Sequence, residues 1–135
     1  MLTRRGFGGC AVCAAVGLVA AGAEAQPQAA QTSGVTRTIV QTTDLDERTT
    51  TLLVTAEIAA GATVARHTHP GIESTYIIDG ACELSVHGMP DRKLKTGEGF
   101  QIPPGAPHGV KNGDRPTKLA ITYIVEKGKP LASPA

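Results

Sequence analysis

Aromatic side chains are scarce in this chain of 135 residues: tryptophan is absent, and there are two tyrosines and two phenylalanines. This scarcity argues against a platform that stacks nucleic-acid bases. A surplus of one charge is also lacking, since 13 Lys and Arg residues stand against 12 Asp and Glu residues. A near-neutral chain offers neither a basic groove for nucleic acid nor a basic patch for an anionic membrane. We therefore expect neither of these partners.

Cysteine is almost missing from the part of the chain that we expect to fold. Cys10 and Cys13 lie near the N-terminus, in positions unsuited to lipid attachment, and only Cys82 follows. A lone cysteine cannot form an internal disulfide, so the domain must be stable without one. We expect Cys82 to be a small buried apolar residue in a strand.

Residues 1–25 have the layout of a secretory signal peptide. A basic start leads into an apolar stretch, residues 6–23, and a small-residue cleavage pattern ends at Ala25. This order is more typical of a signal peptide than of a membrane anchor. The pair Arg4 and Arg5, followed after one residue by Phe7, resembles the twin-arginine export motif, although glycine replaces the expected leucine after Phe7. We expect a periplasmic or secreted protein with no membrane association after cleavage; Sec export is the alternative route.

The rest of the chain is rich in turn-forming residues, with 16 glycines and 9 prolines counted over the whole sequence. These residues separate short β-branched runs, a pattern that predicts an all-β sandwich or barrel. The clearest runs are residues 49–58, 74–79, 82–86, 92–96 and 119–125. We expect a flexible leader over residues 26–34, a single β-barrel domain over 35–126 and a loose C-terminal tail over 127–135.

Three histidines and one glutamate form a candidate metal site. His67 and His69 are two residues apart, so on a strand both side chains point to the same face. Glu73 follows after a Pro-Gly turn, and His108 follows a proline-rich approach to another strand. Three imidazoles and one carboxylate suit Mn(II), Fe(II), Co, Ni, Cu or Zn better than Ca or Mg. Lone histidines in strands are usually structural, but this grouping favours one divalent transition metal.

These residues also lie within two segments that resemble the two motifs of the cupin superfamily, in particular the small single-domain bacterial cupins of the cupin-2 type. The first segment has Gly61, His67, His69, Glu73 and Gly80 in the motif positions, and the second has Gly97, Pro103, Gly105, His108 and Asn112. The resemblance implies a double-stranded β-helix, or jelly-roll, barrel with the metal inside one end. The glycines would lie at turns, where positive φ is needed, and Asn112 would close the final turn.

Cupins include dioxygenases, oxidases, decarboxylases, isomerases and non-catalytic binders, so the resemblance leaves the activity open. Four protein ligands leave one or two metal positions for a substrate. We expect a metal-dependent oxygenase or related oxidoreductase acting on a small organic substrate. The alternatives are a non-catalytic cupin that binds a small ligand or metal, and a metal-dependent isomerase or lyase. Glu73 is a candidate base, and no other catalytic residue is assigned.

The export route bears on the identity of the metal. Zn, Ni and Cu bind such ligands strongly. A protein that folds before twin-arginine export can instead load a metal in the cytoplasm, which favours Mn(II) or Fe(II).

Other polar residues are sorted by strand phase. Thr75 is in phase with Glu73 and is expected to line the pocket, and Gln101 and Tyr123 are further pocket candidates. Tyr76 is out of phase and is expected to pack outside the barrel or at the contact of a candidate homodimer.

Overall fold

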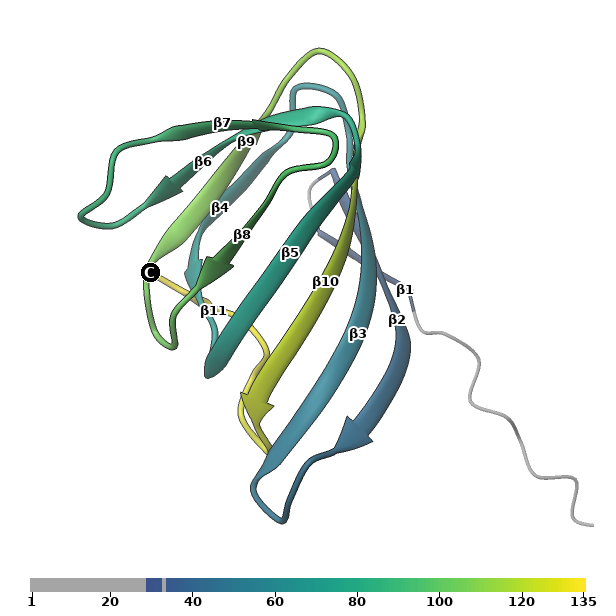
Figure 1. Ribbon diagram of the computed structural model, residues 1–135, viewed down its shortest axis with the longest axis vertical. Helices are drawn as coiled ribbons and strands as arrows, with labels where there is room; N and C mark the ends of the chain where they lie inside the picture. The colour runs from purple at the N-terminus through teal and green to yellow at the C-terminus, as the bar shows by residue number, and fades with distance from the viewer. Residues whose placement is uncertain (1–28, 33) are drawn as a thin grey trace, which may run out of the picture.

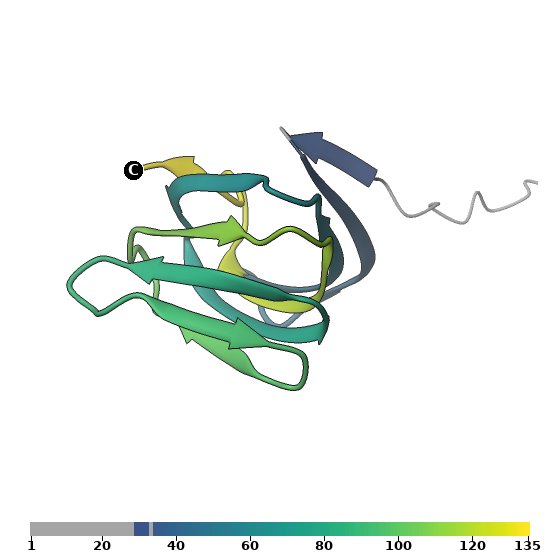
Figure 2. The ribbon, with the colours of Figure 1, turned by 90° about the horizontal axis from the view of Figure 1, so that it is seen from above.

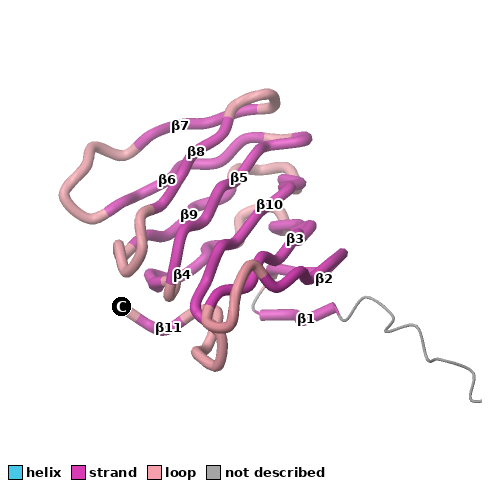
Figure 3. Tube along the Cα trace, turned by 60° about the horizontal axis from the view of Figure 1, so that its bottom comes forward, coloured by secondary structure: helices cyan, strands magenta, loops and turns pink. Residues whose placement is uncertain are grey.

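The computed structural model describes residues 29–32 and 34–135, and this part of the chain consists of strands and loops (Figure 3). The predicted all-β class is confirmed. No helix that could cross a membrane is found among these described residues. The strands are β1 (Ala29–Thr32), β2 (Val35–Asp44), β3 (Thr49–Ile58), β4 (Thr63–Thr68), β5 (Gly71–Asp79), β6 (Ala81–Val86), β7 (Arg92–Lys95), β8 (Gly99–Ile102), β9 (His108–Asn112), β10 (Thr117–Glu126) and β11 (Ser133–Pro134).

The strands form two antiparallel sheets that face each other (Figures 1 and 2). One sheet has the order β1-β2-β3-β10-β5-β8 and the other has the order β11-β4-β9-β6-β7. Strands that are distant in the sequence are neighbours, since β10 lies between β3 and β5, and β9 lies between β4 and β6. This arrangement is consistent with the single-domain jelly-roll barrel that the cupin resemblance implies.

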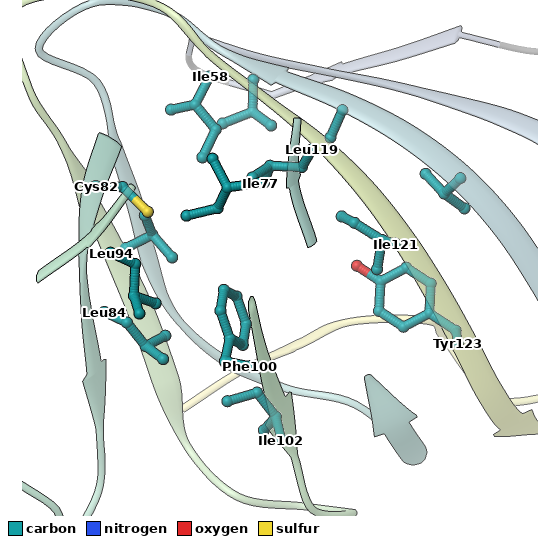
Figure 4. Close-up of a cluster of buried hydrophobic side chains, with 14 of the residues drawn as sticks. Ile58, Ile77, Cys82, Leu84, Leu94, Phe100, Ile102, Leu119, Ile121 and Tyr123 are labelled. Carbon is teal, nitrogen blue, oxygen red and sulfur yellow. The ribbon is translucent and has the colours of Figure 1, made fainter. Parts of the chain in front are cut away.

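Alternating side chains of these strands build one core between the sheets. On β10 the residues Leu119, Ile121 and Tyr123 are buried, whereas Lys118 and Ile124, on the opposite face, are exposed. Figure 4 shows the buried side chains of the larger sheet meeting those of the smaller one across the interior. Each fully buried aliphatic side chain contributes about 1.5–3 kcal/mol to stability.

Both ends of the expected barrel differ from the sequence analysis. Residues 29–32, which we assigned to a flexible leader, form β1, which pairs with residues 35–38 of β2. Without β1, the start of β2 would be an open sheet edge with unpaired backbone groups, and added strands commonly cover such edges. Residues 1–28, which include the expected signal peptide, lie outside the described part of the chain.

The C-terminal segment, residues 127–135, is attached to the barrel at several points rather than loose. Its strand β11 pairs with β4, which places Pro134 opposite His67. The Lys127 ammonium lies 2.9 Å from the Asp44 carboxylate. Regular backbone pairing and this ion pair hold the segment across the end of the barrel that contains the predicted metal ligands.

Asn112 joins three segments at the opposite end of β9. Its side-chain amide donates to the carbonyl oxygens of Ile58, Ala59 and Arg115 at 2.8–2.9 Å, and its oxygen accepts a hydrogen bond from Thr117 at 2.7 Å. Asn112 is buried, with 5% of its surface exposed. The side chain therefore closes the turn after β9, as expected, and also ties that turn to the end of β3.

The four motif glycines that we expected at turns all have positive φ, with φ values of 70°, 104°, 88° and 71° for Gly61, Gly80, Gly97 and Gly105. Gly80 is the most constrained of them. A Cβ on Gly80 would come within 2.6 Å of the Thr117 hydroxyl and 2.8 Å of backbone atoms. The β5–β6 turn therefore requires glycine for both its backbone angle and its close approach.

Replacing Asn112 should destabilise the metal-free protein. Asn112→Ala leaves several buried partners without a hydrogen bond, so we expect the free energy of unfolding to fall by about 3 kcal/mol. Urea unfolding followed by far-ultraviolet circular dichroism measures this change. The control is Gln101→Ala, which removes an exposed side chain with one hydrogen bond to Ser74 and should change the stability by less than about 0.5 kcal/mol. Equal stabilities for the two variants would contradict the structural role of Asn112.

Candidate metal centre

The four predicted ligands come from both sheets and meet inside one end of the barrel. His67 lies near the end of β4, His69 follows that strand, Glu73 lies on β5 and His108 begins β9. Their ligand atoms all lie within 4.8 Å of one another. Three of the four residues are buried, and His67 is partly buried. Residues up to 41 positions apart in the sequence thus form one compact group of metal-binding atoms.

Backbone pairing accounts for this convergence. His67 and His108 are directly opposite each other in the antiparallel pair of β4 and β9. The turn after His69 then leads into β5, where a Cβ on Gly71 would overlap the carbonyl oxygen of Ile124. Only glycine allows β5 to start this close to β10, and that start places Glu73 two residues later at the centre.

Each imidazole is oriented by a backbone carbonyl. The Nδ1–H groups of His67, His69 and His108 donate to the carbonyl oxygens of Ala65, Leu131 and Ala106 at 2.8, 2.6 and 2.9 Å. Because a carbonyl oxygen can only accept, each Nδ1 must carry the proton. All three Nε2 atoms are therefore directed at the centre with the tautomer that a metal ligand needs.

Glu73 supplies the negative charge of the centre. Its Oε2 atom lies 2.8 Å from His69 Nε2 and 3.2 Å from His108 Nε2, and its Oε1 atom accepts a hydrogen bond from Thr75 at 2.6 Å. Burial raises the pKa of Glu73, but the hydrogen bonds from His108, His69 and Thr75 lower it more, and the net pKa is well below the usual range. Glu73 is therefore a carboxylate, the form that binds a cation.

Burial and the charge of Glu73 shift the pKa values of His67 and His108 in opposite directions. Burial, with smaller effects from the neighbouring His108 and His69, lowers the pKa of His67, which favours its neutral form. Burial also lowers the pKa of His108, but its hydrogen bonds to Glu73 and Ala106 raise it more. A proton on His108 Nε2 occupies the place where a metal ion would meet the carboxylate.

The donor set fits a metal ion by its chemistry. The Nε2 atoms of His67 and His69 face each other at 3.1 Å, a contact in which two lone pairs oppose each other unless a proton or a metal ion lies between them. Three imidazoles and one carboxylate, placed in this way, form a group that can bind one divalent transition metal.

Of the other residues considered from strand phase, two lie beside the centre and two lie outside it. Thr75 is buried and contacts Glu73, as its strand phase predicted. Tyr123 lies directly opposite Glu73 on β10, and its ring centroid is 4.8 Å from that of His69. Gln101 is exposed and bonded to Ser74, so it is not part of the centre. Tyr76 is 53% exposed on the outer face.

A small cavity of about 30 Å³ adjoins the ligands. Its walls are mostly apolar. The polar residues in them are the ligands His67, Glu73 and His108 and two others, Arg37 and Tyr123. Arg37 was not predicted from the sequence as a pocket residue. It lies two residues after the buried Val35, so both side chains share one face of β2, but a register shift between Ile39 and Gln41 breaks the pattern of that strand.

Comparisons with known proteins agree with this fold. A model of the cupin domain matches residues 54–125, which include all four ligands. The DMSP lyase DddQ from Ruegeria pomeroyi DSS-3 is 25% identical, with a TM-score of 0.58 over 63% of this chain and 43% of that chain. An RmlC-like cupin from Shewanella frigidimarina is 20% identical, with a TM-score of 0.62 over 76% and 87% of the two chains. The polyketide cyclase RemF from Streptomyces resistomycificus is 19% identical, with a TM-score of 0.61 over 82% and 75%.

The alignment spans less than half the length of the DMSP lyase chains, 43% and 44% for two of them. The likeness to the RmlC-like cupin and to the cyclase shows the shared fold alone. No curated protein matches this chain significantly.

Loss of one ligand should remove most of the bound metal. We expect His67→Ala to weaken metal binding by more than about 100-fold, because losing only an orienting partner of a ligand already costs 10–100-fold. Elemental analysis after dialysis, together with chelator competition, measures this effect. His87→Ala is the matched control, since His87 is exposed and outside the donor group. Equal metal content in the two variants would exclude His67 as a ligand.

The C-terminal segment should contribute to metal affinity through one carbonyl group. Deleting residues 131–135 removes the acceptor for His69 Nδ1, and we expect about 10–100-fold weaker metal binding. Competition with a chromogenic chelator measures the affinity. Leu131→Ala is the control, because it keeps the carbonyl group and loses only the side chain. If that substitution weakens binding as much as the deletion, side-chain packing and not the carbonyl group is responsible.

Proposed function

Because this chain belongs to the cupin family, with a cupin domain over residues 54–125, we propose that it is a metal-dependent enzyme acting on a small organic substrate. The observation that carries the proposal is the convergence of four oriented ligand atoms beside an internal cavity. Four protein ligands leave one or two coordination positions of a five- or six-coordinate ion. Three of the four ligands line the cavity, so a substrate there would lie beside the bound metal.

His67, His69, Glu73 and His108 would hold the metal, which supplies Lewis-acid polarisation of a substrate oxygen when bound. The metal that we propose is Mn(II) or Fe(II), with Zn, Ni and Cu as the alternatives. The mixed nitrogen and oxygen ligands accept all of these ions, and loading before export favours the first two.

Tyr123 is the group best placed to move a proton. Its hydroxyl is directed toward the barrel interior (Figure 4), and only 2% of the residue is exposed. Burial and the charge of Glu73 raise its pKa, against a lowering by Arg37, so the phenol keeps its proton and can donate a hydrogen bond to a substrate. Glu73 is a weaker candidate for the base than its position suggested, because its lowered pKa and three hydrogen bonds stabilise the carboxylate.

For the reaction class we propose proton transfer on a bound substrate, as in a lyase or isomerase. The protonated phenol beside the centre supports this class, and the likeness to a DMSP lyase is consistent with it. The oxygenase or related oxidoreductase is the second candidate. It is favoured by a site of three imidazoles and one carboxylate with open positions, which also suits dioxygen as a co-substrate.

Export and self-association are further proposals. Export to the periplasm rests on the residue pattern of positions 1–25, outside the described part of the chain. A homodimer would bury the outer face of the larger sheet, where Ile72, Tyr76, Ile78 and Ile124 expose apolar surface.

Turnover with and without dioxygen tests the reaction class. The metal-loaded protein is offered a panel of small hydroxy acids, carbonyl compounds and phenols, with product detection and an oxygen electrode. We expect turnover that continues without dioxygen and falls by about 10²–10⁴-fold in Tyr123→Phe. Tyr76→Phe is the control, because that phenol is exposed on the outer face. Oxygen consumption that depends on the substrate would favour the oxidoreductase, and an inert metal-loaded protein would favour a non-catalytic binder.

A further inference from the structure

The cavity beside the metal centre has one cationic wall residue, Arg37. Its side chain comes from β2, in the larger sheet, and is partly buried. Apart from the three ligands that face the cavity, the only other polar side chain in its wall is Tyr123, and the remaining wall is apolar. A guanidinium in such surroundings has lost part of its hydration and is stabilised by an anionic partner.

The described residues supply no such anion. None of the ion pairs of this part of the chain includes Arg37. Glu73 is the only acidic residue in the cavity wall, and both of its oxygens are already engaged by His69, His108 and Thr75. The polar neighbour of Arg37 in the cavity wall is Tyr123, which is a phenol and not a carboxylate.

Charge balance points the same way. A divalent ion bound by one carboxylate leaves the centre with a net positive charge, and Arg37 adds another positive charge nearby. Within a mostly apolar wall, these charges interact more strongly than they would in water. An anionic ligand is favoured there over a neutral ligand of the same shape.

The size of the cavity limits the ligand. A volume of about 30 Å³ holds about two groups the size of a water molecule. The cavity therefore holds the carboxylate group of a small acid rather than the whole molecule. The planar fork of an arginine pairs with a carboxylate through two parallel hydrogen bonds.

We propose that Arg37 is a specificity-determining residue that binds the carboxylate of a small organic acid, with Tyr123 donating a second hydrogen bond to it. A second oxygen of the acid faces the metal centre. The inference rests on the proposed function and names its substrate class: a small carboxylate that carries a further oxygen donor, such as a hydroxyl or carbonyl group.

Binding of a matched pair of probes tests the proposal without requiring turnover. Glycolate and its uncharged analogue glycolamide are titrated into the metal-loaded full chain by calorimetry. We expect glycolate to bind the wild-type protein more tightly than glycolamide. Arg37→Gln should weaken glycolate binding by about 10–100-fold, the loss expected for a charge-assisted pair, and should weaken glycolamide binding much less, because the amide loses only a neutral acceptor's hydrogen bond.

Two controls isolate the role of the guanidinium. Arg66→Gln removes the same charge from an exposed position on β4, next to the ligand His67, and should leave glycolate binding unchanged. Arg37→Lys should restore only part of the affinity, because an ammonium group lacks the bidentate fork. Metal content of one ion per chain in every variant shows that the centre itself is intact.

Glycolate that binds equally to the wild-type protein and Arg37→Gln would overturn the proposal, since the metal alone would then hold the acid. Equal binding of glycolate and glycolamide to the wild-type protein would also overturn it. So would the absence of glycolate binding to a protein with a full metal complement. These outcomes leave the metal-dependent function standing, whereas failure to bind any metal would remove the proposed function itself.

Discussion

The orientation of three imidazole rings by backbone carbonyls is the constraint on which the centre depends. The carbonyls belong to Ala65, at a register shift of β4, to Ala106, in the proline-rich approach to β9, and to Leu131, in the C-terminal segment. Backbone atoms cannot rotate away as side chains can, so the fold itself fixes the tautomers. A change in any of these three segments therefore changes the centre without touching a ligand.

The position of the centre between the sheets determines what it can do. Glu73 and Tyr123 are paired neighbours in the larger sheet, and His67 and His108 are paired neighbours in the smaller one. Closing the barrel brings a carboxylate and a phenol against two imidazoles in an environment with little water. The charges of the centre, of Arg37 and of a bound anion all act more strongly there. This is why one arginine on β2, which is separated from β10 by β3, is sufficient to select a charge class of ligand.

The grouping of the four candidate ligands was predictable because motif spacing and strand alternation depend only on local sequence. His67 and His69 share a face by periodicity, and the regular β3 and β10 were located from their apolar alternation alone. Contacts between distant segments were not predictable in this way. The pairing of residues 29–32 and of the C-terminal segment depends on which sheet edges are open, and the role of Leu131 depends on its carbonyl rather than its side chain. Gln101 was misplaced because its neighbours Phe100 and Ile102, not Gln101, face the interior.

The most direct test of the metal centre is X-ray absorption spectroscopy at the edge of the metal that copurifies with the protein. The structure predicts a first shell of nitrogen and oxygen atoms at about 2.0–2.2 Å, with the multiple-scattering pattern of three imidazole rings. A sulfur scatterer, which would implicate Cys82, or a shell without imidazole scattering would contradict the assignment of His67, His69, Glu73 and His108 as the ligands.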